Sequence, residues 1–310
     1  KNFYQAKKNL GLVFLLLKNF TKGFELYEHR IQQKNKEEYF IEEIKSVYWQ
    51  GENLNDKTIL VLSEQGLGDI IQFSRYIFKL KKDYNVNIIF KTHKKIFHLF
   101  KHKELKLISK DDSIPYHDYH VFLMSIPKIY YKFNSKLLSV NHYFPKNNLI
   151  YNKWKKKLSS MNYLKVGINW SGSLKKDKDE ISIPIKYFAN LVKIKKINFI
   201  SLQKGHGENE IKNFKFNKKV HSFGNNLDLK NPFEDSIEII RQLDLVITSD
   251  TSIAHLSGTI GTKTWVVLNS SPDWRWFLNQ STSPWYKNMK LFRQKDDAYL
   301  VSTITRNFKK

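Results

Sequence analysis

Hydrophobic positions follow two different periodicities along the chain. Between residues 4 and 31, apolar side chains recur every three or four positions, which predicts two amphipathic helices around residues 18–21. The apolar positions that define these helices are Leu10, Phe14, Leu17, Phe24 and Tyr27. From residue 57 onward, short continuous apolar runs alternate with amphipathic or polar stretches, as expected for strands buried on both faces of a parallel sheet. The sequence therefore predicts a helical segment followed by an α/β body.

The apolar runs of this body fall into two successive series of predicted strands. The first series comprises residues 58–63, 85–92, 105–109 and 119–125, and the second comprises residues 164–170, 197–203, 243–249 and 264–269. Amphipathic helices are predicted from Asp69 to about Lys82 and over residues 251–260, where Gly261 ends the helix. Because each series alternates strands with helical or polar stretches, we predict two Rossmann-like domains with ligand-binding residues at the carboxyl ends of their strands.

We expect the domain boundaries where the texture of the sequence changes. Residues 1–50 are predicted to form a helical hairpin and a connector, residues 51–155 the first Rossmann-like domain, and residues 156–310 the second domain with a tail. Pro145, several asparagines and a lysine run mark the linker. The chain opens at Lys1 within a helical pattern, so we expect it to be a fragment of a longer protein.

Composition narrows the class of protein. Apolar residues make up 41% of the 310 residues and aromatic residues 15%, enough to fill the cores of two domains. The absence of cysteine excludes disulfides, thiolate metal sites and cysteine nucleophiles, and it fits a cytoplasmic protein. The longest apolar run, residues 10–17, is too short to span a bilayer.

The net charge of +24 raises the question of a nucleic-acid partner. The lysines are spread along the whole chain and no RNA- or DNA-binding motif accompanies them, so we expect a solvated surface and no nucleic acid. A basic face would still attract an anionic lipid or polysaccharide, with peripheral association at the inner face of the membrane as the consequence.

The strongest motif is SDTSIAHLSGTIG, residues 249–261. A buried strand leads to Asp250, and Thr251 and Ser252 open a helix whose free N–H groups attract an anion, with His255 one turn further on. These four residues are candidate ligands of a nucleotide diphosphate. The alternative is an ordinary capped helix with a packed histidine.

A second motif, SEQGLGDIIQFSRY, follows the first predicted strand. Gly66 and Gly68 allow a tight turn after Gln65, and Asp69 lies at the start of a helix. Asp69 is therefore a candidate general base for an acceptor hydroxyl. The alternative is an acidic residue that complements the helix dipole.

Two further strand ends carry NWSGS (169–173) and SLQKG (201–205). Ser171 and Gly172 offer hydroxyl or backbone donors, and Lys204 offers a positive charge to a leaving diphosphate. Asp177 and Asp179 form an Asp-x-Asp pattern in a lysine-rich loop, and His98 and His102 have the spacing of a helical metal pair without a third ligand nearby. We therefore predict no metal site.

The segment SPDWRWFLNQSTSPWY, residues 271–286, is dense in tryptophan. Trp274, Trp276 and Trp285 fit either the core or a lid, because aromatic density indicates packing more often than stacking on a base. Arg275, between two tryptophans, is less easily explained as a core residue.

In this combination the segments resemble the catalytic region of bacterial tetratricopeptide-repeat glycosyltransferases, which is similar to the heptosyltransferase family (glycosyltransferase family 9). The resemblance covers about residues 50–295, and LYEHR (26–30) resembles the last repeat before the catalytic region. It implies a GT-B fold, in which two Rossmann-like lobes face a cleft, with donor binding mainly in the C-terminal lobe. It also implies inversion at the anomeric carbon and no required metal or cofactor.

Residue by residue, the resemblance assigns the base to Asp69. It assigns the donor site to Asp250, Thr251, Ser252, His255, Lys204 and Ser171. The residues themselves add Gly172 to the donor site and give Gln65, Gly66, Gly68 and Arg275 as candidates for the cleft. The chain departs from the family where an Arg-Ser pair is usual and this sequence has Ile181-Ser182. A phosphate or acceptor contact is therefore lost there, or rebuilt from Lys175, Lys176 or Lys178.

The resulting hypothesis is a glycosyltransferase that moves a sugar from a nucleotide-sugar donor to a glycan, lipopolysaccharide or protein. The helical N-terminal segment is expected to contact protein partners. Two alternatives stay open from the sequence: a non-catalytic binding module of the same fold, favoured by Ile181, and a nucleotide-sugar epimerase.

Overall fold

The computed structural model describes residues 3–32, 44–101, 104–140, 143–172, 182–214 and 217–294. The chain divides into two compact units. Unit 1 comprises Lys1–Ser139 together with Asp273–Asn279, and unit 2 comprises Val140–Pro272 together with Gln280–Lys310. The late segment Asp273–Asn279, which the sequence did not assign to the first domain, thus belongs to unit 1.

The chain first passes from unit 1 to unit 2 after Ser139. The boundary expected from the sequence, between residues 155 and 156, comes later and falls inside helix α6 (Asn148–Leu158). The reason is the packing of Trp154. Its side chain is fully buried, and its Nε1 donates a hydrogen bond of 2.6 Å to Asp235 in helix α8 (Glu234–Ile240) of unit 2. The helix that contains the expected boundary therefore belongs to unit 2.

Unit 1 begins with the predicted pair of helices, α1 (Tyr4–Leu16) and α2 (Phe20–Tyr27). They approach closely because glycines face the contact: a Cβ built at Gly11 would lie 2.7 Å from the backbone nitrogen of Tyr27. A Cβ at Gly23 would lie 2.8 Å from the Leu15 side chain. The helical hairpin is confirmed, and its relation to tetratricopeptide repeats stays a prediction.

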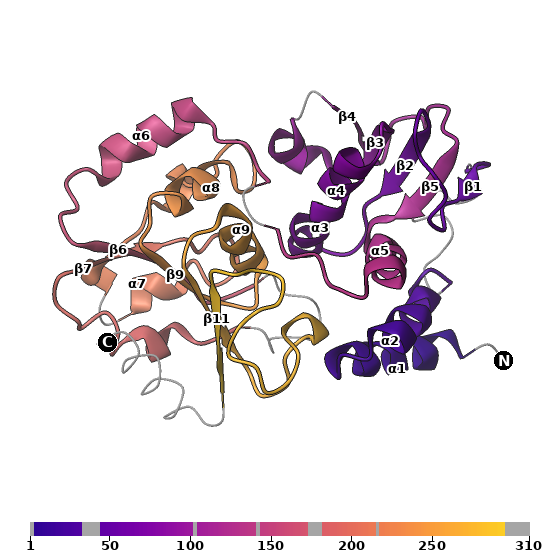
Figure 1. Ribbon diagram of the computed structural model, residues 1–310. Helices are drawn as coiled ribbons and strands as arrows, with labels where there is room; N and C mark the ends of the chain where they lie inside the picture. The colour runs from indigo at the N-terminus through magenta and orange to yellow at the C-terminus, as the bar shows by residue number, and fades with distance from the viewer. Residues whose placement is uncertain are drawn as a thin grey trace. The chain divides into compact units, whose positions relative to one another are not determined.

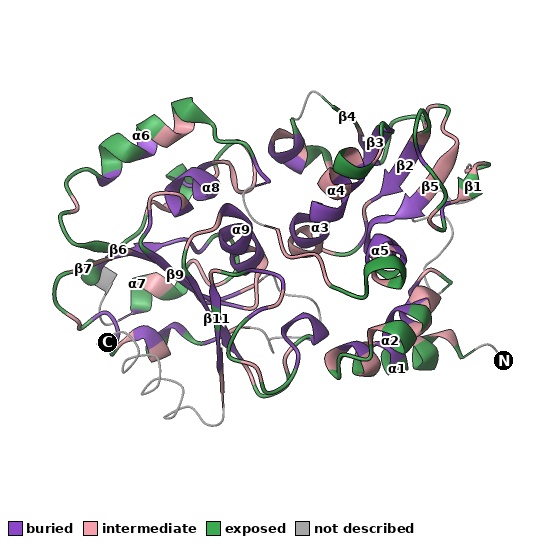
Figure 2. Ribbon diagram, in the orientation of Figure 1, coloured by how far each residue is buried: buried purple, intermediate pink, exposed green. Residues whose placement is uncertain are grey.

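Five parallel strands of the described residues form the sheet of unit 1 (Figure 1). They are β1 (Val47–Tyr48), β2 (Thr58–Leu62), β3 (Asn87–Lys91), β4 (Leu105–Ile108) and β5 (Tyr119–Phe122), in the spatial order β1-β5-β2-β3-β4. The apolar residues of β2 and β3 are buried, as are Val121 and Phe122 of β5 (Figure 2). The helices beside the sheet are α3 (Leu67–Phe73), α4 (Arg75–Asp83) and α5 (Ile126–Asn134).

Two expectations for unit 1 need correction. The helix predicted from Asp69 to Lys82 begins earlier, at Leu67, and it is broken at Ser74. The hydroxyl of Ser74 donates to the carbonyl of Ile71 (2.9 Å), a local bond of the kind that competes with the helical pattern. The strand predicted over residues 119–125 ends at Phe122 and continues as a single 3₁₀ turn.

Unit 2 contains six parallel strands among its described residues. They are β6 (Leu164–Asn169), β7 (Ile197–Ser201), β8 (Val220–His221), β9 (Leu245–Ser249), β10 (Thr264–Leu268) and β11 (Met289–Arg293). Their spatial order, β8-β7-β6-β9-β10-β11, is the 3-2-1-4-5-6 order of a doubly wound Rossmann sheet. The predicted Rossmann topology is confirmed for this unit.

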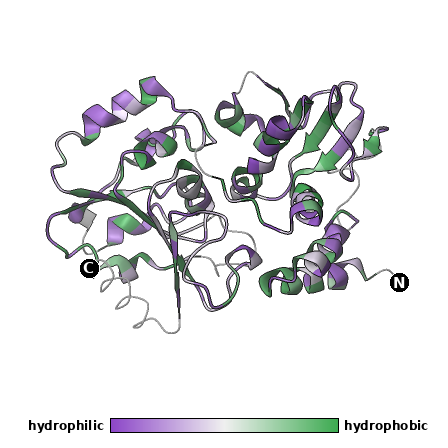
Figure 3. Cartoon of the chain, in the orientation of Figure 1, coloured by the Kyte–Doolittle hydropathy of each residue, from purple (hydrophilic) through white to green (hydrophobic). Residues whose placement is uncertain are grey.

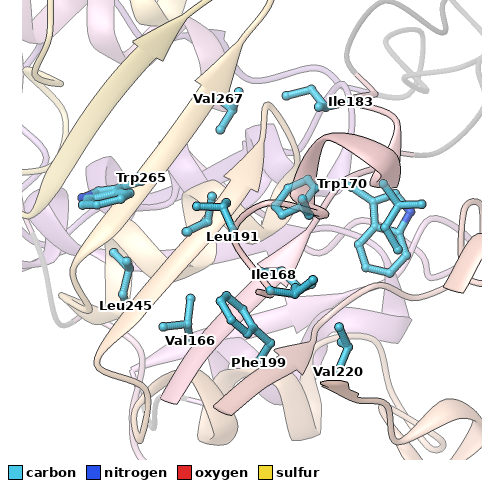
Figure 4. Close-up of a cluster of buried hydrophobic side chains, with 14 of the residues drawn as sticks. Val166, Ile168, Trp170, Ile183, Leu191, Phe199, Val220, Leu245, Trp265 and Val267 are labelled. Carbon is cyan, nitrogen blue, oxygen red and sulfur yellow. The ribbon is translucent and has the colours of Figure 1, made fainter. Parts of the chain in front are cut away.

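The core of unit 2 covers one face of this sheet. Figure 4 shows inward side chains of neighbouring strands, among them Val166, Ile168, Phe199, Leu245 and Val267, packed with Trp170 and Leu191. The other helices of the unit are α7 (Glu210–Asn213) and α9 (Ser252–Ile260), which ends at left-handed Gly261 (φ 91°) as predicted. Figure 3 shows hydrophilic and hydrophobic residues on each of the larger helices, as their amphipathic sequences predict.

Among the described residues, no helix is long and apolar enough to cross a membrane.

Candidate functional site

The order of strands in unit 2 places β6 beside β9. These are the first and fourth strands of the Rossmann order, so the sheet has its topological switch point between them, where ligands bind in open α/β sheets. The chain leaves β6 toward Ser171 and leaves β9 toward Asp250 and Thr251. Three predicted donor residues therefore lie at the carboxyl edge beside the switch point.

Asn169, the last residue of β6, joins these two strand ends. Its buried side-chain oxygen accepts hydrogen bonds from Thr251 Oγ1 (2.8 Å) and Thr248 Oγ1 (3.1 Å). Thr251 is the N-cap residue of α9, yet its side chain makes no cap bond to the helix. Because the hydroxyl of Thr251 donates to Asn169, it does not cap the first N–H groups of α9.

Gln203, just beyond β7, holds the turn after β6 in place. Its Oε1 accepts from Asn169 Nδ2 (2.8 Å), from the backbone N–H of Trp170 (3.1 Å) and from that of Ser171 (2.9 Å). Its Nε2 donates to the carbonyl oxygens of Ser171 (2.9 Å) and His206 (2.5 Å). A continuous hydrogen-bonded chain thus runs from Thr251 through Asn169 and Gln203 to the Ser171 turn.

The hydroxyl of Ser171 continues this chain. Its Oγ lies 2.7 Å from Nδ1 of His206 and 3.0 Å from the hydroxyl of Ser182. The structure therefore brings Ser171 and Thr251, two of the predicted donor residues, into one hydrogen-bonded network. Asn169, Gln203 and His206 were missed from the sequence, although each stands at or just beyond the end of a predicted strand.

The remaining candidates of unit 2 have separate surroundings. Lys204 is exposed, with Nζ 3.4 Å from the carbonyl of Gly224, and Gly172 and Ser252 are half-buried. Asp250 is half-buried directly after β9. His255 is buried, and its Nδ1 lies 3.1 Å from the hydroxyl of Tyr286, so it packs inside the unit beside a tyrosine.

In unit 1, Asp69 is the third residue of α3, and Gly66 is its N-cap. The backbone N–H of Gly66 donates to Asp69 Oδ2 (2.9 Å), which begins the helix earlier than predicted. The tight turn before it was attributed to Gly66 and Gly68, but the left-handed residue of the turn is Gln65 (φ 67°). Asp69 thus has a structural role at the start of α3, where the alternative to catalysis placed it, and it acts there through a hydrogen bond to Gly66.

The other oxygen of Asp69 is bound by Arg275. Arg275 Nη2 donates to Asp69 Oδ1, and Nη1 donates to Asp273 Oδ1 (2.6 Å). Burial alone would lower the pKa of Arg275, but the charges of Asp273 and Asp69 outweigh it and raise the pKa above its usual range. The guanidinium is therefore a permanent cation that fixes the orientation of both carboxylates.

Aromatic side chains hold the segment that carries Arg275. Trp274 is buried, stacks on Phe73 of α3 (ring centroids 6.2 Å apart) and lies edge-on to Phe24 of α2 (6.3 Å). Phe277 lies edge-on to Phe20 (5.6 Å). These tryptophan and phenylalanine rings are packed core, in agreement with the simpler interpretation of the aromatic density.

A buried ion pair stands at the corresponding switch point of the sheet in unit 1, where β2 lies beside β5. Arg30, which follows α2, donates to Glu64, two residues beyond β2, and to the hydroxyl of Ser125, three residues beyond β5 (2.7 Å). Glu64 also accepts from the backbone N–H of Met124 (3.2 Å). The segment that follows the helical hairpin therefore supplies a side chain to the carboxyl edge of this sheet.

Several expectations fall on residues outside the described part of the chain. These residues are His102, Lys175, Lys176, Asp177, Lys178, Asp179 and Ile181. Within the described ranges, no group of three or more histidine, aspartate or glutamate side chains is arranged to hold a metal ion. The independence of metal stays a prediction.

Comparison with known structures identifies the class of fold. The chain superposes on the glycosyltransferase family 9 protein of Veillonella parvula with a TM-score of 0.60, over 84% of this chain and 92% of that one, at 13% identity. The E. coli ADP-heptose lipopolysaccharide heptosyltransferase II gives a TM-score of 0.55 over 80% and 98% of the two chains, at 9% identity. The E. coli heptosyltransferase WaaC, solved with ADP-2-deoxy-2-fluoro heptose, gives 0.55 over 81% and 99%, also at 9%. The chain thus has the α/β fold with parallel sheets found in family 9 glycosyltransferases.

At the level of sequence, the chain is similar to protein FlbA of Caulobacter vibrioides. The two are 24% identical over 304 residues, which cover 90% of this chain and 50% of FlbA. The chain therefore spans half the length of that relative. No model of a known protein family matches the chain.

Proposed function

We propose that this protein is a glycosyltransferase that transfers a sugar from a nucleotide-sugar donor to an acceptor hydroxyl. The observation that carries the proposal is that the hydroxyl of Thr251 bonds to Asn169 and not to the helix that Thr251 begins. Because this hydroxyl bonds to Asn169, Thr251 does not cap α9, whose N-terminus lies at the switch point of a Rossmann sheet. Helical N–H groups at such a point suit the diphosphate of a nucleotide.

The network at the strand ends gives the donor site its other groups. Ser171 and Thr251 are fixed by Asn169 and Gln203, so their positions are set before a ligand arrives. Prearranged donors stabilise developing charge on a leaving diphosphate without reorganisation. The heptosyltransferase with a similar fold that was solved with an ADP-sugar analogue supports a nucleotide-sugar as the donor.

In unit 1 we assign the base to Asp69. The acceptor oxygen attacks the anomeric carbon while the bond from that carbon to the diphosphate oxygen breaks. The hydroxyl proton passes to Asp69, and the nucleoside diphosphate leaves with the bonding electrons. Gly66 and Arg275 each use one lone pair of the carboxylate, which fixes its orientation and leaves lone pairs for the proton.

The finer features of this proposal follow the resemblance to the family. They are a GT-B arrangement of the two units, inversion at the anomeric carbon, no requirement for a metal or cofactor, and a glycan, lipopolysaccharide or protein as the acceptor. We place the reaction in the cytoplasm or at the inner face of the membrane. His255, packed beside Tyr286, is assigned to the support of α9 and not to direct contact with the donor.

A non-catalytic binding module is the second candidate function. It is favoured by the engagement of both Asp69 oxygens in the free protein, since a carboxylate that caps a helix and pairs with arginine serves structure without any reaction.

Two measurements test the proposal. Calorimetric titration with ADP, UDP and GDP, each with and without EDTA, should show binding of at least one nucleotide that EDTA does not abolish. A Thr251→Val/Ser171→Ala variant should weaken that binding at least about tenfold, because it removes the hydroxyl contacts with Asn169 and His206 that hold the two strand ends in place. Absence of any nucleotide binding by a folded protein would reject the donor site.

The second measurement is transfer from the sugar conjugate of the nucleotide that binds. Asp69→Asn should lower turnover by a factor of about 10² to 10⁴, the usual contribution of a general base, and leave nucleotide affinity unchanged. Normal turnover by this variant would reject Asp69 as the base. Nucleotide binding without any turnover by the wild-type protein would instead favour the binding module.

A further inference from the structure

The turn after β7, residues 204–207, is shaped by two glycines in the left-handed region. Gly205 has φ 73° and Gly207 has φ 79°. A Cβ built at Gly207 would lie 2.7 Å from the Cβ of Ser171 and 3.1 Å from Nε1 of Trp170. The backbone of this turn therefore lies directly against the Ser171 turn that follows β6.

His206 stands between these two glycines and is held at two points. Its carbonyl oxygen accepts from Gln203 Nε2 (2.5 Å), and its Nδ1 lies 2.7 Å from Ser171 Oγ. The residue is nevertheless exposed, and within the described part of the chain its Nε2 has no hydrogen-bond partner. A histidine that is fixed through its backbone and one ring nitrogen presents the other nitrogen to solvent in a set direction.

The surroundings of His206 are rich in hydrogen-bond donors. Ser182 contributes a hydroxyl 3.0 Å from Ser171 Oγ, and the fully buried Trp170 has an indole N–H without a partner among the described residues. Glu208 directly follows this turn, and its carboxylate accepts from the backbone N–H of Gly205 (3.2 Å). A cluster of donors with an unmet N–H fits an anionic ligand better than a cation.

We propose that His206 is a ligand of a phosphate group of the nucleoside diphosphate, which neither the motifs nor the resemblance assigned. Its Nε2–H donates to a phosphate oxygen, and its Nδ1 accepts from the Ser171 hydroxyl, which fixes the orientation of the ring. This proposal rests on the proposed donor site. It places a hydrogen-bond donor near Ser182, next to the position where the sequence lacks the arginine of related proteins.

The test is calorimetric titration with ADP, inorganic pyrophosphate and adenosine, or with UDP and uridine if UDP binds more tightly. His206→Ala should weaken the binding of both the diphosphate nucleotide and pyrophosphate about tenfold, the effect of losing one charge-assisted hydrogen bond. It should leave the affinity for the nucleoside unchanged. The control is His221→Ala, which removes an exposed histidine at the end of the neighbouring strand β8.

A second variant tests whether the ligand bound beside His206 is an anion. Glu208→Gln removes the carboxylate of the turn and should strengthen pyrophosphate binding. If His206→Ala binds diphosphates as the wild type does, or loses the nucleoside to the same extent, the assignment of His206 is overturned and the donor site stands. If the wild-type protein binds no nucleotide and no pyrophosphate, the proposed function and this assignment are rejected together.

Discussion

Arg30 and Glu64 form a two-point ion pair in the interior of unit 1. Arg30 Nη2 donates to Glu64 Oε1 (2.6 Å) and Nε donates to Oε2 (3.0 Å), and the two side chains are only 3% and 1% exposed. Although burial alone would lower the pKa of Arg30, the Glu64 and Glu28 charges raise it well above its usual range. Because Glu64 and Ser125, the partners of Arg30, lie beyond the ends of β2 and β5, the segment that follows α2 is part of the carboxyl edge of the sheet.

Breaking this pair should cost much more than breaking a surface pair. Glu64→Gln removes the two-point carboxylate partner of a buried guanidinium and leaves Glu28 as its remaining counter-charge, so we expect a loss of about 3 kcal/mol in the stability of unit 1. Lys79→Ala removes the partner of Asp83 on α4, a pair near solvent, and should cost less than about 1 kcal/mol. Urea unfolding followed by tryptophan fluorescence measures both changes. Equal losses would show that Arg30 finds another partner.

The contact of the Arg275 guanidinium with two carboxylates should matter more for turnover than for folding. Arg275→Lys keeps a cation near Asp69 and Asp273 but cannot bind both carboxylates in the same planar geometry. We expect turnover to fall about tenfold or more because the orientation of Asp69 is lost, and nucleotide affinity to stay unchanged because both residues belong to unit 1.

The control for Arg275 is Arg293→Lys in β11 of unit 2, whose Nε donates to the carbonyl of Gln280 (3.1 Å). A loss of nucleotide affinity in Arg275→Lys, with normal turnover, would contradict the assignment.

Periodicity predicted most of the fold because it depends on local sequence. The buried runs at β2, β6, β9 and β10 and the paired helices α1 and α2 lie where apolar spacing placed them. Strands β1, β8 and β11 were not predicted. β1 and β8 have only two residues each, and β11 alternates apolar residues with Lys290 and Arg293, so none of them forms a continuous apolar run.

The candidate site was predicted only where a single motif contains its residues. Thr251 and Ser171 lie in motifs, but their connection through Asn169 and Gln203 depends on the neighbouring positions of β6, β7 and β9. The contact between Arg275 and Asp69 joins residues 206 positions apart, and no spacing rule reaches that far. The sequence predicts which residues are candidates for the site, whereas the contacts between them depend on the order of the strands.

Gln203 should be the residue of unit 2 on which the donor site most depends. Gln203→Leu removes an acceptor from the buried N–H groups of Trp170 and Ser171 and a donor from two carbonyls. Since each unsatisfied buried group costs about 1–3 kcal/mol, we expect a loss of about 3 kcal/mol in stability together with weaker nucleotide binding.

Gln242→Leu is the matched control, because that side chain is less central and donates to the carbonyls of Glu238 (2.8 Å) and Tyr151 (3.3 Å). It should cost about 1 kcal/mol and leave nucleotide affinity intact. If the two leucine variants behave alike in both unfolding and titration, the network around Gln203 does not organise the site.

Asp228 should give unit 2 a pH dependence of unusual sign. Burial raises its pKa above the usual value, even though it accepts hydrogen bonds from the backbone N–H groups of Asp235 (2.7 Å) and Ser236 (2.9 Å). A carboxyl with a raised folded-state pKa contributes stability that is complete below its unfolded pKa and is lost as pH rises through the folded pKa. Asp228→Asn removes this loss of stability at high pH, so the stability of the variant relative to the wild type should increase from pH 3 to pH 7.

Asp112 is the opposite case, because the N–H of Ser109 lowers its pKa and its contribution to stability is lost as pH falls. Urea midpoints across that pH range should therefore diverge in opposite directions for Asp228→Asn and Asp112→Asn, and parallel curves would show that burial does not control the titration of Asp228.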